Sequence, residues 1–352
     1  MIKKIKVGLN GLGRIGRHIF KMCVDDPLIE LVGINEINPD LNNWAYTLNY
    51  DSIYGQSKNK SLVSGDKLIC NKKYIHTCMQ KDISKVPWDE WGVEFIVDSS
   101  GVLENTIKSK NLLKNRLKKR ILFTNSPANV DFTMILGVNE NKFEPNNHFL
   151  IASSICDATA IAPVTKIIDD LYKIKLGYVT TLHPWLSYQN LMDGPSSSWS
   201  VPGDVYHHYA LGRSSIGNMI PKPTSAIDAV FKVLPSITKN IGSFSYRTPT
   251  PIIGSADISF LVKKKTNKQE IIKSFIDFQN LQNFPILKIS ESPLVSMDYV
   301  GEKYSAIVDT RWLEVINSEL IKIVLWYDNE YGYSCNVISQ IKYIDSLLKL
   351  NH

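Results

Sequence analysis

Six residues near the N-terminus form a glycine-rich loop that could bind a dinucleotide. The loop reads G-x-G-x-x-G from Gly11 to Gly16, after an apolar run at 5–10 and before a helical pattern. Its first glycine allows a tight turn, its second lets a pyrophosphate approach the backbone, and its third lets helix and strand pack closely. The N–H groups at the helix start would face the phosphates. The predicted contacts are Gly11, Gly13, Arg14, Ile15 and Gly16.

An acid further along the chain could select the cofactor. Glu36 lies twenty residues after Gly16, at the end of a second apolar run at 28–35. A carboxylate there would bind the adenosine ribose hydroxyls and repel a 2′-phosphate, so the sequence favours NAD over NADP. The alternative is a surface acid at a strand end. Ser100, which follows a third apolar run at 94–99, is a further predicted cofactor contact.

One cysteine stands where a nucleophile could be placed. Cys156 follows an apolar run and begins a helical pattern, and a helix N-terminus stabilises a thiolate. The alternative is a buried, inert cysteine. An odd number of cysteines with no C-x-x-C argues against a disulfide framework or a zinc site and fits a reducing cytoplasm. The five cysteines are Cys23, Cys70, Cys78, Cys156 and Cys335.

Short apolar runs alternate with helical stretches in the first half of the chain. This rhythm is typical of a mostly parallel, doubly wound sheet. The expected strands are 5–10, 28–35, 94–99, 121–124, 134–138 and 149–151, with helices that include 14–24 and 106–119.

After Cys156 the pattern changes to longer strands with few helices between them, which predicts a mostly antiparallel sheet. The expected strands are 177–183, 243–247, 256–263, 293–298, 305–309, 312–316 and 320–327, and the helices are 158–172, 224–233, 268–278 and 333–348. The predicted fold class is α/β, with an N-terminal Rossmann domain and a second α+β domain. We place the NAD-binding domain at 1–155, completed by the C-terminal helix 333–352, and the catalytic domain at 156–332.

Bulk composition excludes several classes of protein. With 352 residues, of which 44% are hydrophobic and 21% charged, the chain suits an ordinary two-domain globular protein. It has no apolar run of about 18 residues, as a membrane span would need, and no secretory signal pattern. The net charge of +6 favours anionic ligands. The basic run at 108–120 predicts a solvated helix face rather than a nucleic-acid site, because no aromatic residues interleave with it.

Five motifs together resemble the glyceraldehyde-3-phosphate dehydrogenase family. They recur in order from residue 5 to the C-terminal helix, so the resemblance covers nearly the whole chain. The motifs are VGLNGLGRIGR at 7–17, YDSIYG at 50–55, DGPS at 193–196, RTPT at 247–250 and WYDNEYGYS at 326–334.

The resemblance implies a covalent mechanism. Cys156 matches the family's nucleophile and His183 matches the base that activates it. The thiolate would add to an aldehyde to make a thiohemiacetal, and His183 would accept the hydroxyl proton as hydride leaves for NAD. Phosphate or water would then attack the thioester.

The resemblance also implies binding residues and an assembly. Asn329 matches the residue that holds the nicotinamide carboxamide, and Tyr333 the ring beside it. Arg247 matches an arginine that meets anionic groups near the nucleophile, while Arg213 and Thr224 match other anion-site positions. The family forms homotetramers, so we expect a homotetramer here. The expected location is the cytoplasm, which the cysteine pattern fits.

The sequence departs from the family beside the nucleophile. The family's stretch is Ser-Cys-Thr-Thr-Asn-Cys, so Ile155 and Ala158 lack hydroxyl groups that would hold the incoming phosphate. Asp157 adds a negative charge to the anion site, and repulsion at about 4 Å costs about 1–4 kcal/mol. This charge would oppose both thiolate formation and phosphate entry.

Two further departures affect the substrate side. Leu186 and Tyr188 stand where the family has a threonine and an acid or small polar residue. The segment 193–218 is longer than the family norm, and its pair His207 and His208 has no evident third ligand, so we predict no metal site. The segment's aromatic and histidine residues are Trp199, Tyr206, His207, His208 and Tyr209.

We therefore predict an NAD-dependent dehydrogenase for an anionic, phosphorylated aldehyde, with an altered substrate. One alternative is a non-phosphorylating enzyme that releases a free acid. The sequence also leaves open a glycolytic enzyme with a drifted site, a semialdehyde-type reductase that would prefer NADP, and a non-catalytic binding protein. No nucleic-acid or membrane partner is expected.

Overall fold

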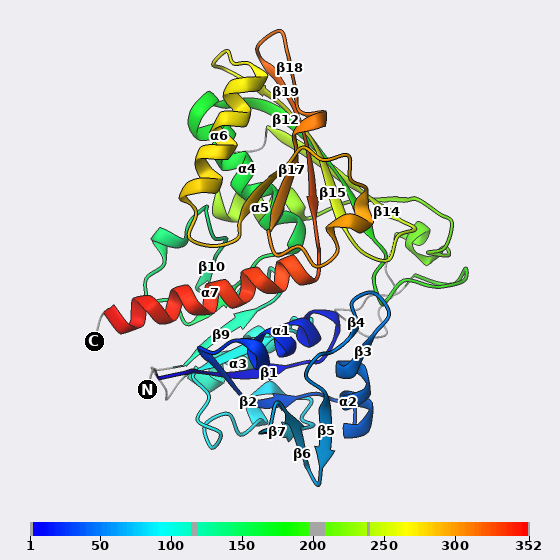
Figure 1. Ribbon diagram of the computed structural model, residues 1–352, viewed down its shortest axis with the longest axis vertical. Coiled ribbons are helices and arrows are strands. Elements are labelled where there is room, and N and C mark those ends of the chain that lie inside the picture. The colour runs from blue at the N-terminus through cyan, green and yellow to red at the C-terminus, as the bar shows by residue number, and fades with distance from the viewer. Residues whose placement is uncertain (1–2, 114–118, 197–207, 238–239, 351–352) are drawn as a thin grey trace. The chain divides into compact units, whose positions relative to one another are not determined.

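The computed structural model of the chain describes residues 3–113, 119–196, 208–237 and 240–350. The chain divides into two compact units, and most of their helices and strands are labelled in Figure 1. The first unit comprises Met1–Met134, Lys142–Ser153 and Val337–His352, and the second comprises Ile135–Asn141 and Ser154–Asn336.

A nine-stranded sheet forms the first unit. Neighbours from β10 to β7 pair in parallel, whereas β7, β6 and β5 pair antiparallel. The predicted mostly parallel sheet is confirmed, although its antiparallel edge was not expected. In spatial order the strands are β10 (Phe132–Thr133), β11 (Leu150–Ala152), β9 (Arg120–Phe123), β8 (Phe95–Asp98), β1 (Ile5–Asn10), β2 (Ile29–Asn35), β7 (Lys73–Cys78), β6 (Lys67–Cys70) and β5 (Ser61–Ser64).

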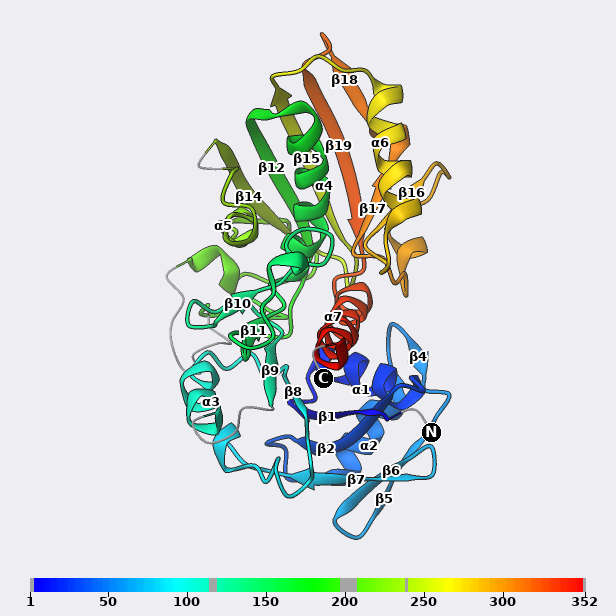
Figure 2. The ribbon, with the colours of Figure 1, turned by 90° about the vertical axis from the view of Figure 1, so that its left-hand side faces the viewer.

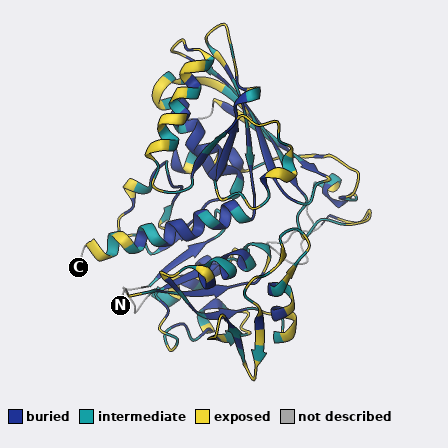
Figure 3. Ribbon diagram, viewed as in Figure 1, coloured by how far each residue is buried: buried dark blue, intermediate teal, exposed yellow. Residues whose placement is uncertain are grey.

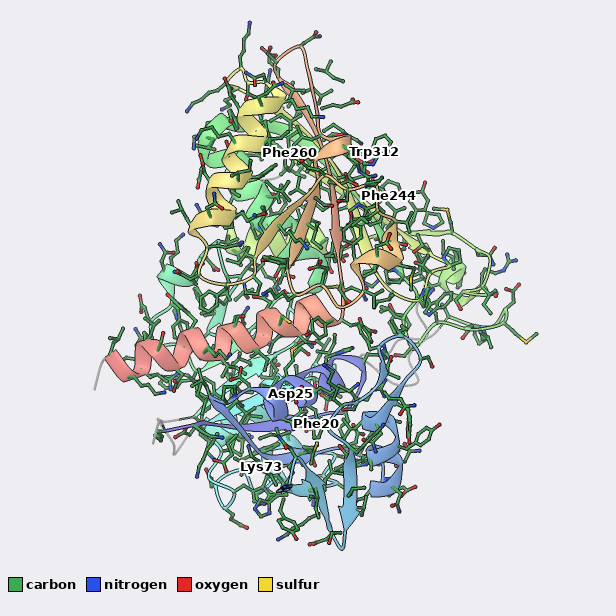
Figure 4. The ribbon with its side chains drawn as sticks, viewed as in Figure 1. Phe20, Asp25, Lys73, Phe244, Phe260 and Trp312 are labelled. Carbon is green, nitrogen blue, oxygen red and sulfur yellow. The ribbon has the colours of Figure 1, made fainter. Side chains whose placement is uncertain are left out.

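Helix α1 (Arg14–Asp25) packs against β1 and β2 because its apolar residues fall on one face. Phe20, labelled in Figure 4, is 1% exposed on that face. The helix begins directly after β1, and this order positions the glycine loop at the end of the strand. The unit's other elements are α2 (Leu41–Asn49), α3 (Asn105–Leu113) and the hairpin of β3 (Tyr50–Asp51) with β4 (Gly55–Gln56).

An eight-stranded, mostly antiparallel sheet forms the second unit, as predicted. Only β12 with β14 and β16 with β17 pair in parallel among the described strands. In spatial order the strands are β13 (Ile220–Lys222), β14 (Ile241–Thr248), β12 (Ile174–Pro184), β15 (Gly254–Val262), β19 (Leu320–Tyr327), β17 (Ala306–Asp309) and β16 (Leu287–Ser290), with β18 (Glu314–Ile316) on β19.

Three helices cover one face of the second sheet, as Figure 2 shows. They are α4 (Cys156–Tyr172), α5 (Ala226–Val233) and α6 (Lys268–Leu281). Helix α4 packs against β12, β15, β17 and β19 and is buried along most of its length, except in its last turn (Figure 3). Phe260 of β15 is 0% exposed in this core. The first residue of α4, Cys156, is therefore held by a rigid core.

The last helix, α7 (Tyr331–Leu350), begins in the second unit, and its residues from Val337 onward belong to the first. In the first unit, Gln340 donates to the Met134 carbonyl over 3.1 Å. Among the described helices, none has both the length and the apolar character that crossing a bilayer requires.

Two strand predictions are wrong. Residues 134–138 form a turn, in which Gly137 has a φ of 80°, and the apolar residues that suggested a strand are buried within that turn. Residues 293–298 are also not a strand, because the Asp298 carboxylate accepts the Val295 N–H over 2.8 Å and closes a 3-10 turn at Ser296–Tyr299. The expected helix 106–119 is seen as α3, while residues 114–118 lie outside the described part of the chain.

Candidate active site

Cys156 and His183 face each other at one end of the second unit. Cys156 is the first residue of α4, and His183 lies next to the end of β12. The Cys156 Sγ lies 3.5 Å from the His183 Nε2. The sequence placed these two residues 27 positions apart, and the fold brings them into direct contact.

Both groups are neutral near pH 7. Burial raises the pKa of the Cys156 thiol well above its ordinary value, and the neighbouring Asp157 carboxylate raises it further. Burial also lowers the pKa of His183 to about 4. The start of helix α4 therefore does not lower the thiol pKa as its position suggested, because desolvation and Asp157 outweigh it. The pair can act as thiol and general base rather than as a preformed ion pair.

The other ring nitrogen of His183 has two polar neighbours. Nδ1 lies 2.8 Å from the Pro184 carbonyl oxygen and 2.5 Å from the Arg247 Nη1. A carbonyl only accepts, so it favours a proton on Nδ1 and a lone pair on Nε2. A guanidinium only donates, so it favours the opposite tautomer. The Pro184 contact is the one that leaves Nε2 able to take the Cys156 proton.

Asp157 is a fixed part of this site. It is 6% exposed, and its Oδ1 accepts a hydrogen bond from the Tyr327 hydroxyl over 2.8 Å. The Cys156 thiol also points at this oxygen over 3.5 Å. Since Tyr327 ends β19 and is 1% exposed, the carboxylate is anchored beside the sulfur by the sheet.

Two positively charged side chains, Arg247 and Lys222, lie on adjacent strands at this site. Arg247 of β14 is 5% exposed, and its Nη2 donates to the Tyr188 hydroxyl over 3.4 Å. Lys222 of β13 pairs with Ser245, two residues before Arg247, so both cations project from the same face. Burial and, to a lesser degree, the Arg247 charge together lower the pKa of Lys222 to about 8. Sequence reasoning missed Lys222, because only the pairing of β13 with β14 places it beside Arg247.

The other expected anion-site residues make different contacts. The Thr224 Oγ1 accepts the Ala226 N–H over 3.2 Å at the start of α5. Arg213 pairs with Asp193 over 2.8 Å on the surface. Neither contact joins them to Arg247 or to the pair of Cys156 and His183. Trp199, Tyr206 and His207 lie outside the described residues, whereas Tyr209 is exposed.

In the first unit, the glycine loop has the backbone that a dinucleotide requires. Gly11 has a φ of 94°, and a Cβ there would lie 2.9 Å from the Ser100 backbone. A Cβ on Gly16 would lie 2.1 Å from the Gly11 carbonyl oxygen, whereas one on Gly13 would meet no heavy atom within 4 Å. Within the described chain no side chain caps α1, so its first turn can face phosphate groups. Ile15 of that turn is partly exposed.

Glu36 and Arg14 are tied to this loop. The Glu36 carboxylate accepts the Leu12 N–H over 2.6 Å and the Asn38 N–H over 3.2 Å. A carboxylate has about four acceptor positions, so two remain for ribose hydroxyls. Arg14 forms an ion pair with Asp51 of the 50–55 motif. The structure thus joins Gly11, Gly16, Ser100 and Glu36 in one place, and the site fits a dinucleotide.

Asn329 and Tyr333 lie in the second unit with Cys156. The Asn329 Oδ1 accepts the Ile253 N–H over 3.0 Å, which leaves its amide N–H groups for a carbonyl. Ile253 has a φ of 73°, which is rare for a β-branched residue. The hydrogen bond from its N–H holds the side-chain amide of Asn329 in place. The Tyr333 hydroxyl donates to the Ser154 carbonyl over 2.9 Å, two residues before the thiol.

Two family models match the chain. The one described as glyceraldehyde 3-phosphate dehydrogenase, NAD binding domain, matches residues 5–106, and the corresponding C-terminal domain model matches residues 155–329. The chain is 33% identical over 341 residues to glyceraldehyde-3-phosphate dehydrogenase 1 of Bacillus subtilis, covering 97% of this chain and 98% of the relative. It is also 35% identical over 341 residues to the Claviceps purpurea enzyme of that name, covering 97% of each.

Proposed function

The chain belongs to the glyceraldehyde-3-phosphate dehydrogenase family of NAD-dependent oxidoreductases, and we propose that it oxidises an aldehyde carrying an anionic group such as a phosphate. Cys156 is the nucleophile in this proposal and His183 is the base. The main support for this proposal is the 3.5 Å contact between the Cys156 Sγ and the His183 Nε2. A nucleophile within reach of an oriented base is the geometry that covalent aldehyde oxidation requires.

The chain's own groups supply the proton transfers. The His183 Nε2 accepts the Cys156 thiol proton as the sulfur adds to the aldehyde carbon. The imidazolium then donates that proton to the alkoxide oxygen, which gives the thiohemiacetal. The imidazole accepts the proton again when hydride leaves and the acyl thioester forms. The Pro184 carbonyl, 2.8 Å from Nδ1, orients the ring for this task.

NAD is the cofactor, and when bound it accepts the hydride that leaves the substrate carbon. We assign its pyrophosphate to the glycine loop, where Gly13 leaves open space, and its ribose to Glu36. We assign its carboxamide to Asn329, whose amide N–H groups remain available.

Arg247 and Lys222 would hold the substrate's anionic group. The Arg247 charge lowers the pKa of Lys222 and so opposes its protonation, whereas the Asp157 carboxylate raises that pKa. An arriving phosphate or carboxylate would relieve that repulsion. A neutral aldehyde would not, so we expect preference for anionic substrates.

Water is a second candidate for attack on the thioester. Asp157 is anchored 3.5 Å from the sulfur, where its charge repels a phosphate dianion. Ile155 and Ala158 offer no hydroxyl groups to hold that dianion. The product would then be a free acid instead of an acyl phosphate.

NADH absorbance with a panel of anionic and neutral aldehydes tests the proposal, with Cys156→Ser as the blank. The expected result is turnover that depends on Cys156 and favours the anionic members. A titration with inorganic phosphate distinguishes attack on the thioester by phosphate from attack by water. Strictly phosphate-dependent turnover supports the acyl phosphate, and phosphate-independent turnover supports the free acid.

We also propose that the protein acts as a homotetramer in the cytoplasm, as members of the family generally do. Sedimentation equilibrium tests the assembly, and a monomer at working concentration would contradict it.

A further inference from the structure

Cys156, Asp157 and His183 present three metal-ligating atoms to one point. Sγ lies 3.5 Å from the Asp157 Oδ1 and 3.5 Å from the His183 Nε2, and the two latter atoms are 3.8 Å apart. In a tetrahedral zinc site, bond lengths of about 2.3 Å to sulfur and about 2.0–2.2 Å to nitrogen and oxygen put donor atoms about 3.3–3.6 Å apart. The three atoms therefore already span nearly the face of a tetrahedron.

Two contacts behind these atoms match those that metal sites use, whereas the Arg247 Nη1, 2.5 Å from the His183 Nδ1, does not. A metal-bound histidine commonly donates its second ring N–H to a carbonyl, and the His183 Nδ1 lies 2.8 Å from the Pro184 oxygen. A bound carboxylate is commonly held by a hydrogen bond, and Tyr327 donates to Asp157 over 2.8 Å. All of these residues lie in the second unit.

We propose that Cys156, Asp157 and His183 form a three-ligand site for a thiophilic divalent cation such as Zn²⁺, and that the bound cation reversibly blocks the nucleophile. The cation forms a bond to the sulfur, and the thiol proton passes to solvent. Thiolate and carboxylate together balance the double charge of the cation. The fourth coordination position remains for water or another small ligand.

This site depends on Asp157, the residue that departs from the family's stretch around the nucleophile. A dyad of cysteine and histidine alone supplies two ligands, which is one fewer than zinc sites with an open position use. Arg247 and Lys222 oppose a cation from nearby, so we expect a bound metal that a chelator removes. The inference uses the geometry of the proposed dyad but requires neither NAD nor aldehyde.

Cobalt absorption spectroscopy tests the site without measuring activity. Co²⁺ added to the chelator-treated protein should produce a sulfur-to-cobalt charge-transfer band and strong visible bands of tetrahedral cobalt, with one equivalent bound per chain. Cys156→Ser should abolish the charge-transfer band. Asp157→Asn, which keeps an acceptor for Tyr327, should weaken Co²⁺ binding at least about 10-fold.

Cys78→Ser is the matched control, because Cys78 is a partly exposed cysteine in the other unit. This variant should keep the band of the original protein. Tyr327→Phe should weaken binding about 10-fold or more through loss of the hydrogen bond to Asp157. A band that survives in Cys156→Ser, or an Asp157→Asn variant with unchanged affinity, overturns the proposal. Those outcomes leave the dehydrogenase proposal standing, because NADH production tests that proposal separately.

Discussion

The Asp157 side chain changes the chemistry of the thiol next to it. Its charge acts on Cys156 through a 3.5 Å contact and adds to the effect of burial, so the thiol pKa is raised. The Tyr327 hydroxyl keeps the carboxylate in place over 2.8 Å. The sequence predicted this repulsion from position alone, but it could not predict Tyr327, which lies 170 positions away.

Replacing the acid should therefore activate the thiol. In Asp157→Ser, the pH at which iodoacetamide labels Cys156 at half its maximal rate should fall by about one to three units. A charge repulsion of about 1–4 kcal/mol is removed, and about 1.4 kcal/mol corresponds to one unit. Labelling rates measured across a pH series, with chelator present, check this. Asp170→Ser is the control, since Asp170 is an exposed acid on the same helix paired with Lys166. An unchanged profile in Asp157→Ser would count against the repulsion.

Lys222 should affect binding more than chemistry. Lys222→Met should raise KM for an anionic aldehyde about 10-fold, because a charged hydrogen bond contributes about 1.5–3 kcal/mol. Its kcat should change less, and KM for a neutral aldehyde should not change. Steady-state kinetics on paired substrates measure this, with the exposed Lys264→Met as the control. A loss of kcat alone would refute a binding role.

The junction of β1 with α1 carries the glycine loop to which we assign the pyrophosphate of the cofactor. Gly13 and Gly16 of this loop have different surroundings. A Cβ on Gly16 would lie 2.1 Å from the Gly11 carbonyl oxygen, whereas one on Gly13 would lie in open space. The sequence motif predicted both roles, because the spacing of glycines depends on local backbone geometry alone.

These two glycines allow a matched test. Gly16→Ala should destabilise the protein by about 1–3 kcal/mol through overpacking. Gly13→Ala should leave stability nearly unchanged but weaken NAD binding, because the new methyl group occupies the space proposed for the pyrophosphate. Urea unfolding and NAD titration by fluorescence measure the two effects. Equal losses of stability in both variants would contradict the assigned roles.

The hairpin of β3 and β4 is joined to α1 by a charge pair. Burial alone would raise the pKa of Asp51, but hydrogen bonds from the Ile53 N–H, the Arg14 side chain and the Tyr54 N–H lower it to about 2. The group thus binds its proton less readily in the folded state than in the unfolded state. Its stabilisation is present above the ordinary value of 3.8 and is lost as pH falls toward 2.

Asp51→Asn should remove that pH-dependent part of the stability, at most about 2 kcal/mol. Urea unfolding at neutral pH and again below pH 4 measures it. The variant should differ most from the original protein at neutral pH, and the difference should shrink in acid. A difference that stays constant with pH would show that Asp51 contributes through something other than its charge.

Helices and strands with a regular pattern of apolar residues were predicted well from the sequence, whereas turns and short, irregular strands were not. The buried run at 134–138 has the composition of a strand, but Gly137 turns the chain there, and sequence alone did not separate a buried turn from a buried strand. Strand β13 is short and contains Pro221, so it has no recognisable pattern. Its pairing with β14 nevertheless brings Lys222 to the site.

On the scale of the whole molecule, the residues proposed to bind the cofactor and the proposed nucleophile are divided between the two compact units. The glycine loop and Glu36 belong to the first unit, whereas Cys156, His183 and Asn329 belong to the second. The change from alternating helices and strands to long adjacent strands predicted this division into two sheets. The sequence alone did not predict which side chains within the second sheet would touch, because those contacts depend on strand pairings that are remote in sequence.

In the proposed mechanism, one sulfur holds the substrate covalently. The most direct test is intact and peptide mass spectrometry of the protein quenched in acid after incubation with NAD and an aldehyde substrate. We predict an acyl adduct on Cys156 that forms only when NAD is present and is absent from Cys156→Ser. NADH production at an undiminished rate in Cys156→Ser, or an adduct on another cysteine, would contradict this mechanism.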